Sequence, residues 1–177
     1  MAEGSKHILL LCGGPCVGKS ALIKQLASQV DKLDIGGFYT EPEYDARQRV
    51  GFKVKTFDGA EVLAAHINTQ SNERVGKFGV DSTALDSIMQ HAMNVEPAIF
   101  LIDELGKLEC KSAYFRQRME ALLEANVVMV VTAPLKGTSL LEKYQNHPNV
   151  LKIRINETNA EQVLHSAQRW LSLQFSE

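Results

Sequence analysis

Three short apolar runs recur along the chain, at residues 7–12, 98–102 and 127–131. Each run is bounded by turn residues or acids, and none shows a regular alternation with polar positions. This pattern is typical of strands that are buried on both faces, as in parallel sheets. A fourth segment, 150–155, alternates more strongly and predicts a last strand.

Between these runs, apolar residues recur at the spacing of an amphipathic helix. The stripe is clear over residues 19–30, where Leu22, Leu26 and Val30 fall on one face. The same spacing predicts helices in four later segments, which are 85–92, 115–123, 139–145 and 163–171.

Two of these later helices carry start or stop signals. Asp81 or Ser82 can cap the first of them, and Pro97 stops it. Thr158 with Glu161 matches a capping box ahead of the last helix.

The segment between the first two helices predicts β-structure. Residues 37–40 and 51–57 look like two strands, and the charged, turn-rich segment 41–49 joins them as a β-hairpin. Residues 62–67 add a short strand. Elsewhere strands and helices alternate, which predicts an α/β fold with a mostly parallel central sheet and the hairpin as an insertion. The length suits one domain over residues 1–177.

The stretch from Gly13 to Ser20 fits the pattern G-x-x-x-x-G-K-[ST] and stands between a predicted strand and a predicted helix. Glycines let the backbone curl until successive N–H groups point at phosphate oxygens, and the helix adds its positive N-terminal end. Lys19 would face the β and γ phosphates, and the Ser20 hydroxyl would reach Mg²⁺. The motif predicts a nucleoside-triphosphate site made by Gly13, Gly14, Pro15, Cys16, Val17, Gly18, Lys19 and Ser20.

A pair of acids, Asp103 and Glu104, directly follows the apolar run that ends at Ile102. Ligands of α/β sheets bind at the carboxyl ends of the strands, so this pair is expected beside the phosphate loop. We predict that Asp103 and Ser20 hold Mg²⁺. Glu104 can orient and deprotonate a water that is aimed at the γ-phosphate.

Cations that could stabilise the transferring phosphoryl group are harder to identify. Lys107 and Arg74 are the candidates, and the alternative for each is an ordinary surface charge. Residues 103–106 also fit the D-x-x-G of GTPase switch regions. The sequence lacks the Asn-Lys-x-Asp that binds guanine, which disfavours a dedicated GTPase.

Composition narrows the function classes. The chain has 19 basic and 21 acidic residues, a formal net charge of −2 and no long block of like charge. The charge signature of a protein that coats nucleic acid is therefore missing, although a local basic patch formed by folding stays open. The polar N-terminus, with an apolar run too short for a signal peptide or a membrane span, predicts a soluble, cytoplasmic protein.

The three cysteines, Cys12, Cys16 and Cys110, cannot all pair, and no Cys-x-x-Cys is present. They are interpreted as free thiols of a reducing compartment. Oxidation of Cys16, inside the phosphate loop, would block the site and stays open as an alternative role.

Several strings make the chain resemble a known family. They are GFYTE at 37–41, GFKV at 51–54, RVGKF at 74–78 and IDELGKLE at 102–109. Together they are similar to the thermophilic nucleoside-triphosphatase family, which has a cancer-related human relative. The resemblance runs from the phosphate loop to about Gly137, and more loosely to the C-terminus.

The resemblance implies a compact, three-layer α/β/α P-loop fold. It also implies an enzyme that uses Mg²⁺ to hydrolyse ATP, GTP and other nucleoside triphosphates slowly. It implies that Glu104 is the acid that activates water. With Lys19 from the phosphate-loop motif and Lys107 as a candidate cation, Glu104 makes up the predicted catalytic set. The resemblance also implies a second nucleotide-contacting segment, which comprises Phe100, Leu101, Ile102, Asp103, Glu104, Leu105, Gly106 and Lys107. Relatives often have glycine where this chain has Cys16.

Three functions stay open at this point. The leading hypothesis is Mg²⁺-dependent hydrolysis of nucleoside triphosphates. The second is a nucleoside or nucleotide kinase, for which the segment 41–49 with Arg47 and Arg49 is the nearest candidate lid. The third is a switch module whose slow hydrolysis times an interaction with a protein partner that the sequence does not identify.

Overall fold

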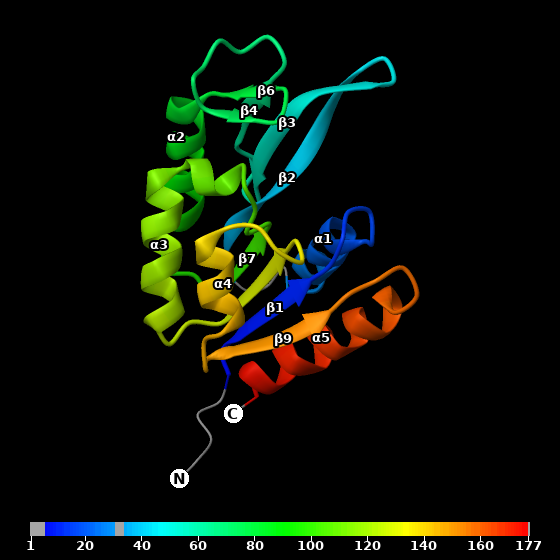
Figure 1. Cartoon of the computed structure of the whole chain (residues 1–177). Helices are drawn as coiled ribbons and strands as arrows, with labels where there is room; N and C mark the ends of the chain where they lie inside the picture. The colour runs from blue at the N-terminus through cyan, green and yellow to red at the C-terminus, as the bar shows by residue number, and fades with distance from the viewer. Residues whose placement is uncertain (1–5, 31–33, 177) are drawn as a thin grey trace.

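The computed structural model describes residues 6–30 and 34–176, which form one sheet with helices on its faces (Figure 1). The order of the described strands across the sheet is β5-β6-β4-β3-β2-β7-β8-β1-β9. The strands are β1 (Ile8–Cys12), β2 (Ile35–Asp45), β3 (Gln48–Thr56), β4 (Glu61–His66), β5 (Arg74–Val75), β6 (Phe78–Val80), β7 (Ile99–Asp103), β8 (Met129–Ala133) and β9 (Val150–Arg154). The helices are α1 (Lys19–Gln29), α2 (Ser82–Met93), α3 (Ala113–Glu124), α4 (Ser139–Gln145) and α5 (Ala160–Gln174), with a 3-10 turn, η1 (Glu109–Lys111).

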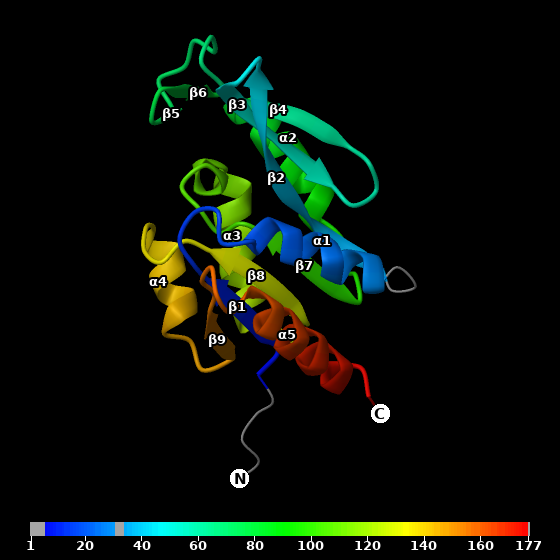
Figure 2. The same ribbon diagram turned by 90° about the vertical axis from the view of Figure 1, so that its right-hand side faces the viewer.

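The strands β2, β7, β8, β1 and β9 are parallel to one another and are called the parallel half here. Every residue of β1, β7 and β8 is buried, as the apolar runs predict. Helices α1 and α5 cover one face of this half, and α2, α3 and α4 lie on the other (Figure 2). Two apolar layers, one on each face, make the core and fix the strand ends in place.

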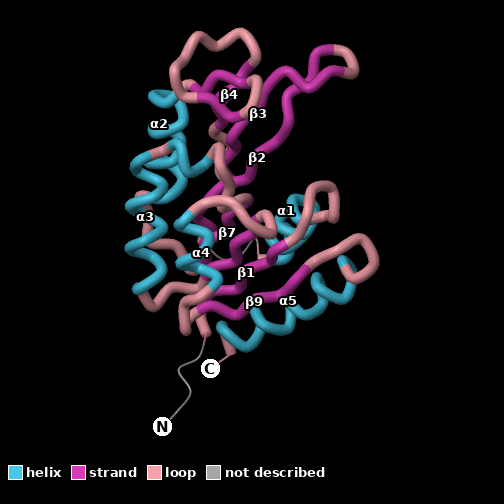
Figure 3. The backbone as a smooth tube through the Cα atoms, in the orientation of Figure 1, coloured by secondary structure: helices cyan, strands magenta, loops and turns pink. Residues whose placement is uncertain are grey.

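The strands β3, β4, β6 and β5 pair antiparallel beyond β2 and are called the antiparallel half. On one face, residues such as Val54, Ala64 and Val80 pack in the same core cluster as α2. The opposite face carries ion pairs instead, such as Lys55 with Glu41 at 2.8 Å. The hairpin of β2 and β3 extends beyond the helices, as Figure 3 shows.

The prediction of a mostly parallel sheet was wrong, because the sheet is mixed. The β-hairpin itself is confirmed, but it is not an insertion beside the sheet. Residues 35–39 of β2 pair with β7, and the same strand continues over residues 38–45 as the partner of β3. The expected loop 41–49 lies mostly within β2 and β3, and β4, β6 and β5 then continue the sheet outward.

Two element boundaries also differ from expectation. The strand predicted from residue 127 begins at Met129. The prediction of a capping box before α5 was wrong. The Thr158 hydroxyl donates to Asn156 Oδ1 at 2.8 Å, and the N-cap residue is Asn159. Asn156 Oδ1 also accepts the Asn159 N–H, at 3.1 Å, so a side-chain turn takes the place of the box.

Other expectations are confirmed. The Asp81 side chain caps α2 by accepting the Ala84 N–H at 3.0 Å. The short helix α4 has the predicted bounds. Among the described helices, none is long and apolar enough to cross a membrane.

Candidate active site

The phosphate loop predicted from the sequence connects β1 to α1. Two of its residues have left-handed backbone conformations, Gly18 with φ 99° and Cys16 with φ 59°. Gly18 has no side chain to cap α1, so the N–H groups of the first helical turn are left for another acceptor. The loop thus has the features of an anion site at a helix N-terminus.

Lys19 is held at the centre of this loop. Its ammonium donates to the carbonyl oxygens of Gly13 at 2.8 Å and Ala133 at 3.3 Å. It also forms an ion pair with Glu104 Oε2 at 3.0 Å, although the two residues are 85 positions apart. The Lys19 side chain is only 11% exposed, so this charge is fixed in place before any ligand binds.

Asp103 lies at the carboxyl end of β7, beside the loop, and is buried. Its Oδ2 accepts the Ser20 hydroxyl at 2.6 Å, and its Oδ1 accepts the Thr132 hydroxyl at 2.6 Å. Burial raises the pKa of Asp103, and the two hydrogen bonds oppose that rise. Hydroxyl and carboxylate oxygens are the donors that Mg²⁺ prefers, so Ser20 and Asp103 fit the predicted metal site.

Thr132 is a site residue that was not predicted from the sequence. This residue lies in β8, next to β7, and orients Asp103 from the side opposite Ser20. A threonine within an apolar strand run gave a weak signal, because its role depends on which strands are neighbours.

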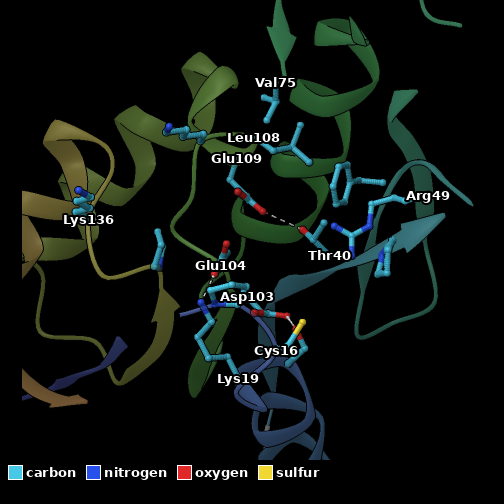
Figure 4. Close-up of a pocket in the computed structure, with 16 residues that line it drawn as sticks. Cys16, Lys19, Thr40, Arg49, Val75, Asp103, Glu104, Leu108, Glu109 and Lys136 are labelled. Atoms are coloured by element: carbon cyan, nitrogen blue, oxygen red, sulfur yellow. Dashed lines mark hydrogen bonds and ion pairs between the residues drawn. The ribbon is translucent and has the colours of Figure 1, made fainter. Parts of the chain in front are cut away.

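These residues border a pocket of about 520 Å³, shown in Figure 4. One side of it comes from the phosphate loop and the ends of β7 and β8. The other side comes from β2, β3, β5 and the segment around η1. The lining residues are Pro15, Cys16, Lys19, Ser20, Thr40, Pro42, Arg49, Phe52, Val75, Asp103, Glu104, Lys107, Leu108, Glu109, Pro134 and Lys136.

Glu109 is the most unusual residue of this pocket, because its carboxyl group is buried, with only 3% of the residue exposed. Its Oε1 accepts the Thr40 hydroxyl at 3.1 Å. Burial, with a further contribution from the negative charge of Glu104, raises the pKa of Glu109 to about 8. Glu109 therefore carries a proton at neutral pH and can donate a hydrogen bond as well as accept one.

Gly106 separates the two glutamates. A methyl group on its Cα would lie 2.9 Å from Glu109 Oε2 and 3.1 Å from Glu104 Oε1. Both carboxyl groups therefore lie close over this one position, and only glycine leaves room for them. Glu109 belongs to the string IDELGKLE at 102–109, but no role was predicted for it.

The candidate cations are placed differently. Lys107 lines the main pocket and also an adjoining one of about 460 Å³. Lys136, from the connection between β8 and α4, lines the main pocket and was not predicted. Arg74 lies only in the adjoining pocket, and its guanidinium donates to the Lys77 carbonyl at 2.6 Å. The geometry thus brings Lys107 to the site and does not bring Arg74 there.

The second nucleotide-contacting segment is only partly at the pocket surface. Phe100, Leu101 and Ile102 are buried in β7 and are absent from the residues that line the pocket. Their side chains pack in the two core layers. They therefore position Asp103 and Glu104, while the acids themselves face the pocket.

Comparison with known proteins places the chain among nucleoside-triphosphatases. A family model described as NTPase matches residues 8–167. Nucleoside-triphosphatase THEP1 of Thermotoga maritima is 32% identical over 160 residues, which span 89% of this chain and 91% of that protein. The mouse cancer-related nucleoside-triphosphatase homolog is 29% identical and spans 90% of this chain and 93% of its own length.

Solved structures agree with this result at the level of the fold. The crystal structure of THEP1 from Aquifex aeolicus matches with a TM-score of 0.83 and 25% identity, covering 96% of this chain and 99% of that one. The solution structure of a human cancer-related nucleoside triphosphatase has a TM-score of 0.81 at 24% identity, with 96% and 100% coverage.

Proposed function

Since this chain belongs to the NTPase family and is a nucleoside-triphosphatase, we propose that it hydrolyses ATP, GTP and other nucleoside triphosphates to the diphosphate and phosphate, with Mg²⁺ bound. The observation that carries this proposal is the 3.0 Å ion pair between Lys19 and Glu104. The ion pair joins Lys19, at the centre of the phosphate loop, to Glu104, the acid that would activate the attacking water.

Substrate binding follows from the loop. The N–H groups of residues 13–20 and the N-terminal end of α1 attract the phosphates, and Lys19 lies against the terminal two. Ser20 and Asp103 would hold Mg²⁺, with Thr132 keeping Asp103 in its orientation. When bound there, Mg²⁺ neutralises charge on the β and γ phosphates.

Water activation is the role of Glu104. An arriving γ-phosphate competes with Glu104 for the Lys19 ammonium, because both are anions within reach of it. The carboxylate is then released on the γ-phosphate side of the pocket, where it accepts a proton from the attacking water. The same contact would keep the acid paired until substrate arrives.

Charge stabilisation comes from the cations of the loop and of the pocket rim. Phosphoryl transfer spreads charge over the equatorial oxygens, and fixed cations lower its energy. Lys19 would contact these oxygens from the phosphate-loop side of the pocket. Lys107 and Lys136 line the pocket and supply further positive charge.

The test is phosphate release from ATP, GTP, CTP and UTP, measured with Mg²⁺ and with EDTA. We expect turnover of several of these substrates, and a loss of at least about tenfold in EDTA, which is roughly 1.4 kcal/mol of barrier. Ser20→Ala should lose rate and need more Mg²⁺. The matched control is Ser28→Ala, an exposed serine of α1 whose hydroxyl bonds to the Gln25 carbonyl.

Two results would overturn this proposal. One is full phosphate release in EDTA, which would show that hydrolysis does not depend on Mg²⁺. The other is a Ser20→Ala protein with the same Mg²⁺ dependence as wild type, which would place the metal elsewhere.

A further inference from the structure

The adjoining pocket, of about 460 Å³, lies beside the main pocket. It is bordered by β5 with the turn after it, by the segment 107–111 that follows β7, and by Thr138, the N-cap of α4. Lys107 and Val75 line both pockets, so the two pockets meet at these side chains. Figure 4 shows Val75 on the side of the main pocket away from Lys19. The adjoining pocket therefore lies away from the phosphate loop.

Three cations line the adjoining pocket. Arg74 comes from β5, and Lys107 and Lys111 come from the segment after β7. Neither aspartate nor glutamate is among the described residues that line it. The main pocket, in contrast, is lined by acids that include Asp103 and Glu104. An anion in the main pocket is therefore attracted towards the adjoining one and repelled by the carboxylates it leaves.

These cations are available to a ligand. Within residues 6–30 and 34–176, Lys107 has no hydrogen-bond or ion-pair partner. The Arg74 guanidinium uses one N–H on the Lys77 carbonyl, at 2.6 Å, which leaves its other N–H groups for an anion. Lys111 pairs with Glu73 at 3.1 Å, but the two side chains are 33% and 55% exposed. An ion pair this exposed contributes little, so an anion can compete for the ammonium.

Thr138 adds a neutral donor. Its hydroxyl oxygen accepts the Leu141 N–H at 3.2 Å and the Cys110 S–H at 3.7 Å. A threonine hydroxyl has two acceptor positions and one proton, so both acceptor positions are filled and the proton is left to donate. The cations and this hydroxyl are all donors, and an oxyanion is the ligand that accepts from every one of them.

Hydrolysis supplies such an anion next to this pocket. Once the γ-phosphoryl group has been transferred to water, inorganic phosphate lies between the nucleoside diphosphate and Glu104. The diphosphate stays on the phosphate loop and closes that side, so the phosphate leaves by another side. Lys107 lines both pockets and can keep contact with the phosphate as it moves from one to the other.

We propose that the adjoining pocket binds the inorganic phosphate that hydrolysis releases. Arg74, Lys107 and Lys111 supply the positive charge. The Thr138 hydroxyl donates a further hydrogen bond. This inference rests on the proposed function of the main pocket, because that reaction makes the phosphate. The site is separate from the position of the γ-phosphate, so phosphate can occupy it while a triphosphate is bound. Phosphate that accumulates in solution then fills it and blocks the departure of newly formed phosphate.

The test is isothermal titration calorimetry of inorganic phosphate into the protein with Mg²⁺ and a saturating non-hydrolysable ATP analogue, at constant ionic strength. The analogue fills the position of the γ-phosphate, so phosphate that binds must lie elsewhere. We expect millimolar or tighter binding in wild type. Binding should be at least about fivefold weaker in Arg74→Ala and in Lys111→Ala, because each variant loses a charged donor.

The two variants lie on different segments, so disturbance of a single turn cannot explain a loss in both. The matched control is Lys77→Ala, in the same turn as Arg74 but outside the pocket lining. It keeps the backbone carbonyl that Arg74 contacts and should bind phosphate as wild type does. The inference is overturned if the analogue-loaded protein binds no phosphate at millimolar concentration. It is also overturned if either Arg74→Ala or Lys111→Ala binds phosphate as tightly as wild type.

Inhibition of ATP hydrolysis by added phosphate tests the same site during turnover. The inference predicts that phosphate lowers the maximal rate at saturating ATP. Arg74→Ala should be inhibited less, relative to its own rate without added phosphate. Phosphate that bound only at the γ-phosphate position would compete with ATP, and its effect would disappear at saturating ATP. That result would refute the inference and leave the proposed hydrolysis standing. If ATP is not hydrolysed at all, the proposed function fails, and calorimetry with the analogue still decides whether the anion site exists.

Discussion

The parallel and antiparallel halves of this molecule border the same pocket but are built in different ways. The parallel half has helices on both faces, and its strands β1, β7 and β8 are buried throughout. The antiparallel half has α2 on one face, with ion pairs such as Lys53 with Glu43 at 3.5 Å on the other. The fully covered half carries the phosphate loop, Asp103 and Glu104, while the half-covered one supplies Arg49 and Phe52.

This difference indicates that the two halves contribute different kinds of side chain to the pocket. Charges that must stay fixed, such as Lys19 and Asp103, are held by the ends of strands that are packed on both faces. Arg49 and Phe52 come from a strand with one open face, where side chains can differ at a smaller cost in packing. Substitutions in each half test this interpretation.

Removing the central cation of the parallel half should have the largest effect. Lys19→Ala should lower phosphate release by about 10³-fold, roughly 4 kcal/mol, because it removes a fixed charge from the phosphates. The control is Lys24→Ala, an exposed lysine of the same helix that pairs with Glu41 at 2.6 Å. Steady-state phosphate release checks both, and equal rates for the two variants would contradict the role of Lys19.

The buried carboxyl group of Glu109 predicts a pH dependence of stability. Its pKa of about 8 lies above the ordinary 4.5, so between these values the folded state keeps a proton that the unfolded chain has lost. The free energy of unfolding therefore falls as pH rises through this interval, by roughly 3 kcal/mol between pH 5 and pH 8. Glu109→Gln should remove this part of the slope.

Urea unfolding at several pH values measures that slope. Asp103 also has a raised pKa and acts in the same direction, so the comparison is between wild type and Glu109→Gln, which share Asp103. Glu120→Gln, an exposed change on α3, serves as the control. Parallel pH profiles for wild type and Glu109→Gln would show that Glu109 is ionised in the folded protein at neutral pH.

Matched valine truncations test whether the two halves unfold together. Val130 of β8 and Val54 of β3 are both fully buried. Val→Ala at either position should cost roughly 2 kcal/mol, from two lost carbons and the space they leave. Urea unfolding followed by fluorescence and circular dichroism should give one transition in both variants. A second transition in Val54→Ala alone would mean that the antiparallel half unfolds separately.

Much of the parallel half could be predicted from the sequence, because its signals are local. Apolar runs, helical stripes and the phosphate-loop pattern each lie within a few residues of one another. The proximity of Lys19 to Glu104 followed from one rule, that ligands bind at the carboxyl ends of strands. The side-chain turn at Asn156 was missed, because Ser, Thr and Asn residues compete for the same backbone N–H groups.

The antiparallel half was harder to predict for physical reasons. Strands β5 and β6 have two and three residues, too few to show a period. The roles of Thr132, Glu109 and Arg49 depend on contacts between elements far apart in sequence. The charged segment 41–49 has the composition of a loop, yet β2 and β3 include most of it because their polar face is open to solvent.

The smallest effect concerns backbone strain in each half. Cys16 in the phosphate loop and Ala46 in the hairpin turn have φ values of 59° and 54°. The left-handed conformation costs a residue with a side chain about 1–2 kcal/mol, and a glycine avoids this cost. Glycine also gives the unfolded chain more conformational entropy, which offsets part of the gain in stability. Cys16→Gly and Ala46→Gly should therefore each stabilise by roughly 0.5 kcal/mol in urea unfolding. A loss of stability in either would show that the side chain makes compensating contacts.

We propose that Glu104 activates the attacking water while the loop holds the phosphates, and Glu104→Gln separates these two roles. Binding of a non-hydrolysable ATP analogue with Mg²⁺ and phosphate release from ATP are measured on the same protein sample. We predict affinity within a few-fold of wild type and phosphate release lower by about 10²–10⁴-fold. Phosphate release at the wild-type rate would contradict the claim.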